Sequence, residues 1–200
     1  MRILLATMNA GKLREYERLL AGVPGLELET MASLSAPIEV VEDRDTFHGN
    51  ALKKATEIAK VAGVICLADD SGLEVDFLGG RPGVHSARFA GERASDDQNN
   101  AKLLDALRDT AESQRTARFR CAIVVVNPTG QELAAVDGVC EGRIAREASG
   151  AHGFGYDPLF VPDGHSETMA ELGPETKNRI SHRAEAAAKL VPLLQHLRNP

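Results

Sequence analysis

Two adjacent acidic residues, Asp69 and Asp70, follow the apolar run 64–68 and precede Ser71 and Gly72. The run predicts a buried strand that carries both carboxylates at its carboxyl end. Carboxylates in that position are costly unless they are solvated, paired or bound to a metal ion. Magnesium prefers hard oxygen ligands and usually takes one or two carboxylates plus substrate phosphates. The pair therefore predicts a magnesium site, with a solvated acidic turn as the alternative.

A second cluster lies between a short apolar run and an amphipathic segment, and consists of Thr7, Met8, Asn9, Ala10, Gly11 and Lys12. The start of a helix offers backbone N–H groups and the positive end of the helix dipole, which suit phosphate. Lys12 adds a cation. This is not a Walker A loop, because Leu13 stands where Ser or Thr is needed. The segment predicts a phosphate-binding turn, and a plain strand–helix turn is the alternative.

Two more clusters lie in the last third of the chain, and their candidate residues are Phe154, Gly155, Tyr156 and Asp157 in one and Lys177, His182 and Arg183 in the other. Glycines beside an aromatic residue leave its ring open to stack on a base. The second set supplies hydrogen-bond donors just before or at the start of a helix. The alternatives are an inward-packed Phe154 and a solvated charged face. Together the four clusters supply what nucleotide hydrolysis requires.

These clusters must be positioned by a mixed α/β arrangement. Apolar periodicity predicts strands at 3–6, 26–28, 64–68, 119–126 and 132–137, and helices from 13, over 46–62, from 95 and from about 181. Thr46 is the expected cap of the second helix, and residues 127–130 read as a hairpin turn. No repeat or long linker appears, so we expect one domain over residues 1–200.

Composition limits the partners of the chain. The net charge is −6, which gives no basic field for a nucleic acid polymer. The first residues contain too short an apolar run for a signal peptide, and no stretch is long enough to span a membrane, so we expect a cytoplasmic protein. The three cysteines, two of them in apolar runs, read as buried reduced thiols.

Six motifs, in order along the chain, resemble those of the Ham1/RdgB-type noncanonical purine NTP pyrophosphatases, also called ITPases or dITP/XTP pyrophosphatases. They are T-x-N-x-x-K at 7–12, T-F-x-x-N-A-x-x-K-A at 46–55, A-D-D-S-G-L at 68–73, G-G-x-P-G-x-x-S-A-R at 79–88, G-F-G-Y-D-P at 153–158 and K-N-x-I-S-H-R at 177–183. The resemblance covers essentially the whole length.

The resemblance implies an elongated α/β fold of two lobes around a central mixed sheet, with the nucleotide in the cleft between them. It also implies a homodimer, Mg²⁺, and hydrolysis of ITP, dITP or XTP to the nucleoside monophosphate and pyrophosphate. Carried over by position, residues 7–12 hold the triphosphate, and Asp70 is the proton acceptor and a metal ligand, with Ser71 beside it on the substrate. Residues 154–157, Lys177, His182 and Arg183 surround the base.

Two departures from the family pattern affect these expectations. Met8 replaces a frequent glycine, so the backbone there must avoid positive φ. Gly49 stands where many members carry Glu, which makes Glu42 the better candidate for an additional metal ligand and Glu39 the fallback. A carboxylate bound to Mg²⁺ is a weak base, so the neighbour of Asp70 could accept the proton instead. A nucleotide-binding regulator that does not hydrolyse its ligand is the alternative class.

Overall fold

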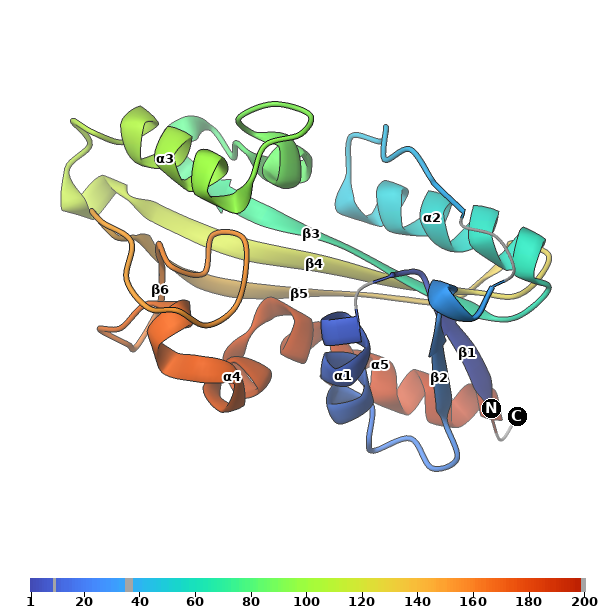
Figure 1. Cartoon of the computed structure of the whole chain (residues 1–200). Coiled ribbons are helices and arrows are strands. Elements are labelled where there is room, and N and C mark those ends of the chain that lie inside the picture. Colours follow the sequence, from blue (N-terminus) through green and yellow to red (C-terminus); the bar gives the residue numbers. More distant parts are fainter. Residues whose placement is uncertain (9, 35–37, 199–200) are drawn as a thin grey trace. The chain divides into compact units, whose positions relative to one another are not determined.

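The computed structural model describes residues 1–8, 10–34 and 38–198. Within these residues one six-stranded sheet has the order β2-β1-β3-β4-β5-β6 (Figure 1). β1 pairs in parallel with β2 and β3, whereas β5 and β6 are antiparallel, so the expected mixed α/β sheet is confirmed. The strands are β1 (Arg2–Leu5), β2 (Glu27–Thr30), β3 (Cys66–Val75), β4 (Thr116–Val126), β5 (Glu132–Ile144) and β6 (Phe160–Pro162).

Five α-helices are found in the described residues: α1 (Ala10–Leu19), α2 (Phe47–Ala62), α3 (Asp96–Ala106), α4 (Met169–Ile180) and α5 (His182–Arg198). The hydroxyl of Thr46 accepts from the Gly49 N–H, which confirms the predicted cap of α2. A capping box at Ser95 starts α3 in the same way. Helix α4 was not expected from the sequence, because Gly173 (φ 74°) and Pro174 interrupt its apolar pattern.

The chain divides into two compact units, each made of separate chain segments. Unit 1 comprises Met1–Asp70, Cys121–Gly138 and Arg183–Pro200, and unit 2 comprises Ser71–Arg120 and Val139–His182. β3, β4 and β5 each contribute residues to both units. Two of the junctions, 70–71 and 182–183, fall inside motifs that the sequence analysis singled out. The single domain over 1–200 stays a prediction.

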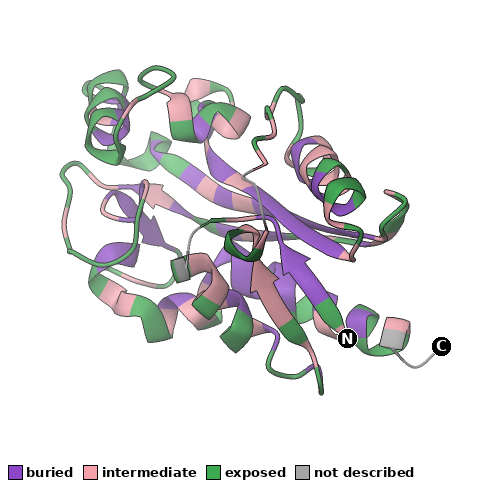
Figure 2. Ribbon diagram, turned by 45° about the vertical axis from the view of Figure 1, so that its right-hand side comes forward, coloured by how far each residue is buried: buried purple, intermediate pink, exposed green. Residues whose placement is uncertain are grey.

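The central strands of unit 1, namely β1 and the parts of β3 and β4 in this unit, are buried on both faces, as their apolar runs predict. Alternate residues of each strand face opposite ways. On one face Leu4 and Val124 pack with Ile58 of α2, and on the other Ile3 and Ile123 pack with helices α1 and α5. Figure 2 shows the central strands of this sheet as mostly buried ribbon, whereas β2 at its edge is intermediate or exposed. Unit 1 is therefore a three-layer structure around the first part of the sheet.

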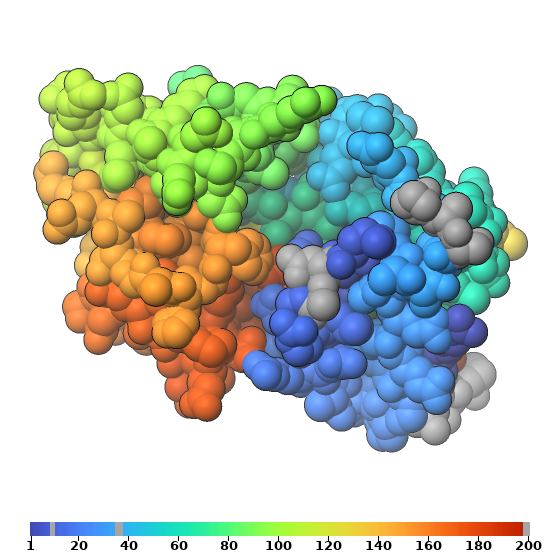
Figure 3. Space-filling view, viewed as in Figure 1, coloured from blue at the N-terminus to red at the C-terminus, as the bar shows by residue number. Residues whose placement is uncertain are grey.

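The core of unit 2 gathers residues of β3, α3, β4, β5, β6 and α4, among them Leu73, Leu103, Phe119 and Phe160. The rings of Phe119 and Phe160 meet edge to face, with centroids 4.7 Å apart. In the space-filling view the green surface of the segment around α3 adjoins the orange surface of the segment before β6 (Figure 3). This packing places the loops of unit 2 that contain the candidate residues.

One expectation about the acidic cluster is corrected. β3 continues to Val75, so Asp69 and Asp70 lie inside the strand and not at its carboxyl end. Their polarity hides the continuation, although Leu73 and Val75 resume the buried alternation. Lys177 lies in the last turn of α4, and the donor-rich segment 177–183 reaches the start of α5 at His182, as predicted. The three cysteines are buried free thiols, as predicted. No helix in the described part of the chain is long and apolar enough to cross a membrane.

Candidate functional site

In unit 1 the carboxylate of Asp69 is the centre of a buried ion-pair cluster. Its side chain is 2% exposed, and its oxygens lie 2.9 Å from Lys12 Nζ and 3.0 Å from Arg183 Nη2. Burial opposes the charge, but Lys12, Arg183 and Lys54 hold the pKa of Asp69 well below its usual value. Asp69 is therefore a fixed anion whose oxygens are already engaged by cations.

Asp70, the next residue of β3, has a different environment. It is 9% exposed, and its Oδ2 accepts a hydrogen bond of 2.9 Å from Asn50 Nδ2. Burial and then the charge of Glu42 raise the pKa of Asp70 to about 6, against the opposing effects of Asn50 and Lys54. Glu42, one of the two acids expected as an additional metal ligand, is therefore close enough for its charge to act on Asp70.

Asp70 and Glu42 are the carboxylates that would hold a magnesium ion together with substrate phosphates. No group of three or more His, Cys, Asp or Glu side chains that could hold a metal ion occurs among the described residues. Mg²⁺ seldom needs such a group, because one or two carboxylates together with substrate phosphates are sufficient ligands. Burial is the main cause of the raised pKa of Asp70, and a divalent cation would relieve the second cause, its repulsion by Glu42. Lys54 lies beside them, paired with Glu42.

The predicted phosphate-binding segment is partly described. α1 begins at Ala10, so Lys12 lies in its first turn, and its ammonium group contacts Asp69. Thr7 is half-buried, and Met8 and Gly11 are exposed. Asn9 lies outside the described residues, as does the side chain of Ala10. No described residue other than glycine has a positive φ, as expected for Met8.

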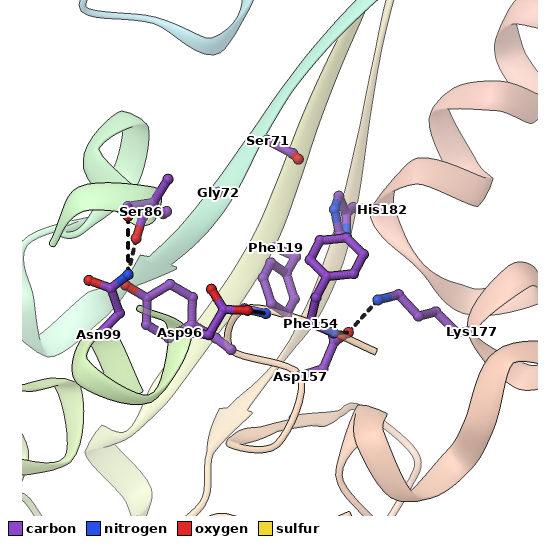
Figure 4. A pocket seen from close by; sticks show the side chains of 13 residues that line it. Ser71, Gly72, Ser86, Asp96, Asn99, Phe119, Phe154, Asp157, Lys177 and His182 are labelled. Atoms are coloured by element: carbon purple, nitrogen blue, oxygen red, sulfur yellow. Dashed lines mark hydrogen bonds and ion pairs between the residues drawn. The ribbon is translucent and has the colours of Figure 1, made fainter. Parts of the chain in front are cut away.

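Unit 2 contains a pocket between its 3-10 helix η3 (Gly83–Arg88), α3 and the glycine-rich loop 153–157 (Figure 4). Its cavity volume is about 140 Å³, similar to the roughly 150 Å³ of an engineered cavity that binds benzene. The pocket therefore has room for an aromatic ring. Seven predicted site residues line it: Ser71, Phe154, Gly155, Tyr156, Asp157, Lys177 and His182.

Phe154 presents its ring at this pocket and is 50% exposed. The ammonium nitrogen of Lys177 lies 4.4 Å from the centroid of the ring. Lys177 also forms an ion pair with Asp157, whose Oδ2 accepts the N–H of Phe154 at 3.0 Å (Figure 4). The glycines do leave the ring accessible, as expected, but a cation covers part of one face.

Tyr156 and His182 form walls of the pocket. Tyr156 is buried, and its hydroxyl donates to the Ser86 carbonyl at 2.8 Å. The His182 ring stacks on Phe119, with centroids 4.9 Å apart and planes inclined by 18°. Of the two aromatic residues in the loop, Phe154 is therefore the exposed one and Tyr156 is part of the buried wall.

The described contacts of Arg183 are with acidic side chains of unit 1, and its expected contact with a base stays a prediction. Its guanidinium is 1% exposed and donates to Asp69 and to Glu15, both in unit 1. Successive residues of a helix point about 100° apart, because a turn takes 3.6 residues. His182 and Arg183 are the first two residues of α5, so their side chains point in different directions. Sequence adjacency alone could not separate their roles.

Several contributing residues were missed by the sequence analysis. Asn50 and Lys54, which contact Asp70 and its neighbours, stood in a quoted motif without an assigned role. Ser86, which lines the pocket, also lay in a motif. Phe119 reads in the sequence only as an apolar strand residue, so no local signal identifies it.

The sheet, the charged cluster and the pocket define an α/β protein with a ligand site for an aromatic ring. The chain belongs to the Ham1 family, whose family model matches residues 3–193. A dITP/XTP pyrophosphatase of Leifsonia xyli subsp. xyli is 50% identical over 200 residues, which cover 100% of this chain and 98% of that protein. The dITP/XTP pyrophosphatase of Bacillus subtilis is 46% identical over 192 residues, 96% of each chain.

Solved structures show the same likeness. A HAM1 protein from Coxiella burnetii has a TM-score of 0.89 and 40% identity, and the match covers 98% of this chain and 99% of that one. A nucleoside-triphosphatase / dITP/XTP pyrophosphatase from Mycobacterium abscessus has a TM-score of 0.78 and 46% identity, with 97% and 100% covered.

Proposed function

We propose that this chain hydrolyses noncanonical purine nucleoside triphosphates (ITP, dITP and XTP) to the nucleoside monophosphate and pyrophosphate. The names of its full-length relatives support the reaction. The observation that carries the proposal is the pocket of unit 2, where the Phe154 ring and the Lys177 ammonium lie at a cavity of the size of an aromatic ring. The ring supplies a stacking surface and the ammonium supplies hydrogen-bond donors.

The choice among purines follows from the donors at Lys177. An ammonium group can only donate, so it favours the C6 oxygen of hypoxanthine and xanthine over the C6 amine of adenine. Its anchoring by Asp157 keeps this donor in place. Guanine shares the C6 oxygen, so its 2-amino group has to be rejected by shape or by a facing donor. Sites built on buried hydrogen bonds discriminate by factors on the order of 10⁴.

Mg²⁺ is the proposed cofactor, held by Asp70 and Glu42 together with substrate phosphates. When bound, it neutralises the negative charge that grows on the phosphate oxygens in the transition state. Lys12, in the first turn of α1, is proposed to hold the triphosphate together with backbone N–H groups of residues 7–12. Asp69 keeps the Lys12 ammonium close to this turn.

We assign the orientation or deprotonation of the attacking water to Asp70 and not to Asp69. General-base catalysis is most effective when the pKa of the base lies near the working pH. The pKa of Asp70 is raised to about 6, mainly by burial, whereas cations lower that of Asp69. Asp69 therefore acts through its partners, as the anion that fixes Lys12 and Arg183.

Product analysis tests the reaction. Purified protein with Mg²⁺ should convert ITP, dITP and XTP to monophosphate and pyrophosphate, with little product from ATP or GTP. Ion-exchange chromatography separates these products. Release of inorganic phosphate and a diphosphate, or equal turnover of GTP and ITP, would contradict the proposal.

Replacement of Lys177 tests the origin of base selectivity. Lys177→Met removes the donors, and a hydrogen bond to a charged group contributes about 1.5–3 kcal/mol, or roughly 10- to 100-fold. We expect kcat/KM for ITP to fall by that factor while the value for ATP changes little. The double variant Lys177→Met/Asp157→Asn, which leaves no unpaired buried charge, serves as the folding control. An equal loss of kcat/KM for ITP and ATP would show that Lys177 does not determine the choice between these substrates.

A homodimer and a cytoplasmic location complete the proposal. The dimer rests on the family resemblance, and light scattering of the purified protein tests it. The net charge of −6 and the three free thiols are consistent with an intracellular enzyme that acts on small nucleotides and binds no nucleic acid polymer. Fractionation of cells for the activity tests the location.

A further inference from the structure

Two side chains of α3 hold both backbone polar groups of Gly155. Asp96 Oδ2 accepts the Gly155 N–H at 2.6 Å, and Asn100 Nδ2 donates to the Gly155 carbonyl at 2.9 Å. Asp96 and Asn100 are four residues apart, so they lie on the same face of the helix. Figure 4 shows the Asp96 carboxylate directed at the loop that carries Phe154. One helix therefore fixes the orientation of this glycine.

The hold on Gly155 also fixes the backbone of Phe154. The N–H of Phe154 itself is bonded to Asp157 Oδ2, and the next N–H along the chain is the one held by Asp96. Both peptide planes that flank the Cα atom of Phe154 are thus held by carboxylates. Since these planes set the direction of the Cα–Cβ bond, they aim a ring that is itself half exposed.

The burial of Asn100 indicates a purpose beyond packing. Asn100 is 7% exposed, and within the described residues its Oδ1 has no hydrogen-bond partner. A buried amide with an unbonded oxygen costs stability, and an apolar side chain of similar size would avoid that cost. The bond from its Nδ2 to Gly155 is the feature that an apolar side chain could not supply.

We propose that Asp96 and Asn100 are positioning residues that aim the Phe154 ring for stacking on the base of the substrate. The inference rests on the proposed function and deepens it, because it assigns base affinity to a helix that supplies no stacking group. Asp96 also lies in the first turn of α3, where any acidic residue complements the helix dipole. Asp97 also lies in the first turn of α3 but makes no side-chain hydrogen bond among the described residues, so it is the matched control.

The test compares KM and kcat for XTP in four single variants. Asp96→Ala should raise KM about five- to tenfold with kcat within about twofold, because base–aromatic stacking contributes at that level. Asp97→Ala should match the unchanged protein, and Asp96→Asn, which keeps an acceptor for the Gly155 N–H, should recover most of the affinity. Asn100→Leu should raise KM without lowering the thermal midpoint. Equal KM values for Asp96→Ala and Asp97→Ala would overturn the proposal.

A double variant tests whether Asp96 acts through Phe154. If it does, Asp96→Ala should have no further effect on KM in a Phe154→Ala background. A further rise of five- to tenfold there would show that Asp96 acts elsewhere and would overturn the proposal.

Inosine, which carries the base without phosphates, separates this inference from the proposed function. Its affinity, followed by NMR titration, should fall in Asp96→Ala by the same factor as for XTP. Inosine binding without pyrophosphate release from any purine triphosphate would refute the hydrolysis but still measure the positioning effect. Absence of both binding and turnover in the unchanged protein would overturn both.

Discussion

Asp70→Asn is expected to abolish nucleotide hydrolysis and at the same time to stabilise the metal-free protein. The unfolded-state pKa of Asp70 is close to 3.8, and burial together with Glu42 raises the folded value to about 6. The folded state therefore binds the proton more tightly, so the ionised carboxylate destabilises it above pH 6. A shift of about two units corresponds to roughly 3 kcal/mol at neutral pH. Asparagine removes the charge and can still accept from Asn50.

Thermal unfolding in EDTA at two pH values measures this effect. At pH 7.5 the midpoint of the Asp70→Asn variant should exceed that of the unchanged protein. The difference should shrink between pH 6 and pH 4, because the native carboxyl then becomes protonated as well. Added Mg²⁺ should raise the midpoint of the unchanged protein more than that of the variant. Substantial residual hydrolysis by the variant, or the same midpoint as the unchanged protein at pH 7.5, would contradict the assignment.

Asp69→Asn, one residue away, is expected to do the opposite and to destabilise the protein by about 3–5 kcal/mol. Breaking a buried ion pair leaves an uncompensated charge, and here the guanidinium of Arg183 is 1% exposed. The pKa of Asp69 is lowered in the folded state, so its stabilising contribution is present above pH 3.8 and is lost as the pH falls below that value. Urea unfolding at pH 7.5 measures the loss.

Two controls separate this loss from a general intolerance of the site. Glu15→Gln removes the other partner of Arg183 but leaves Asp69 in place, so it should cost less. Asp69→Leu/Arg183→Met removes both buried charges and should recover much of the stability, because apolar pairs often replace buried ion pairs without loss. If Asp69→Asn were as stable as Asp70→Asn, the ion pairs of Asp69 would contribute little to the free energy of unfolding, contrary to the prediction.

The contrast between these two carboxylates shows how much of the site depends on tertiary structure. The sequence places them side by side and leaves open which one accepts a proton. Within a strand, neighbouring side chains point to opposite faces, so Asp69 and Asp70 meet different partners. The cations at Asp69 come from Lys12, 57 residues away, and from Arg183, 114 residues away. No local pattern encodes such contacts.

The sequence by itself determined the features that arise from neighbouring residues. Thr46 and Ser95 start their helices because a side-chain oxygen bonds an N–H three residues ahead, a contact that the local chain makes alone. The turn at 127–130 joins β4 to β5 for the same reason: the Gly130 N–H donates to the Asn127 carbonyl, and the Gln131 N–H donates to Asn127 Oδ1. The motif order was likewise sufficient to identify the family, because that comparison needs no geometry.

Only the tertiary structure decided what each polar group contacts. It assigned Arg183 to Asp69 and His182 to Phe119, although the two residues are neighbours in the sequence. It also placed α3 next to the loop that carries Phe154, although Asp96 and Gly155 are 59 residues apart in the sequence. Local propensity acts over a few residues, whereas these contacts depend on how strands and helices distant in the sequence pack around the core.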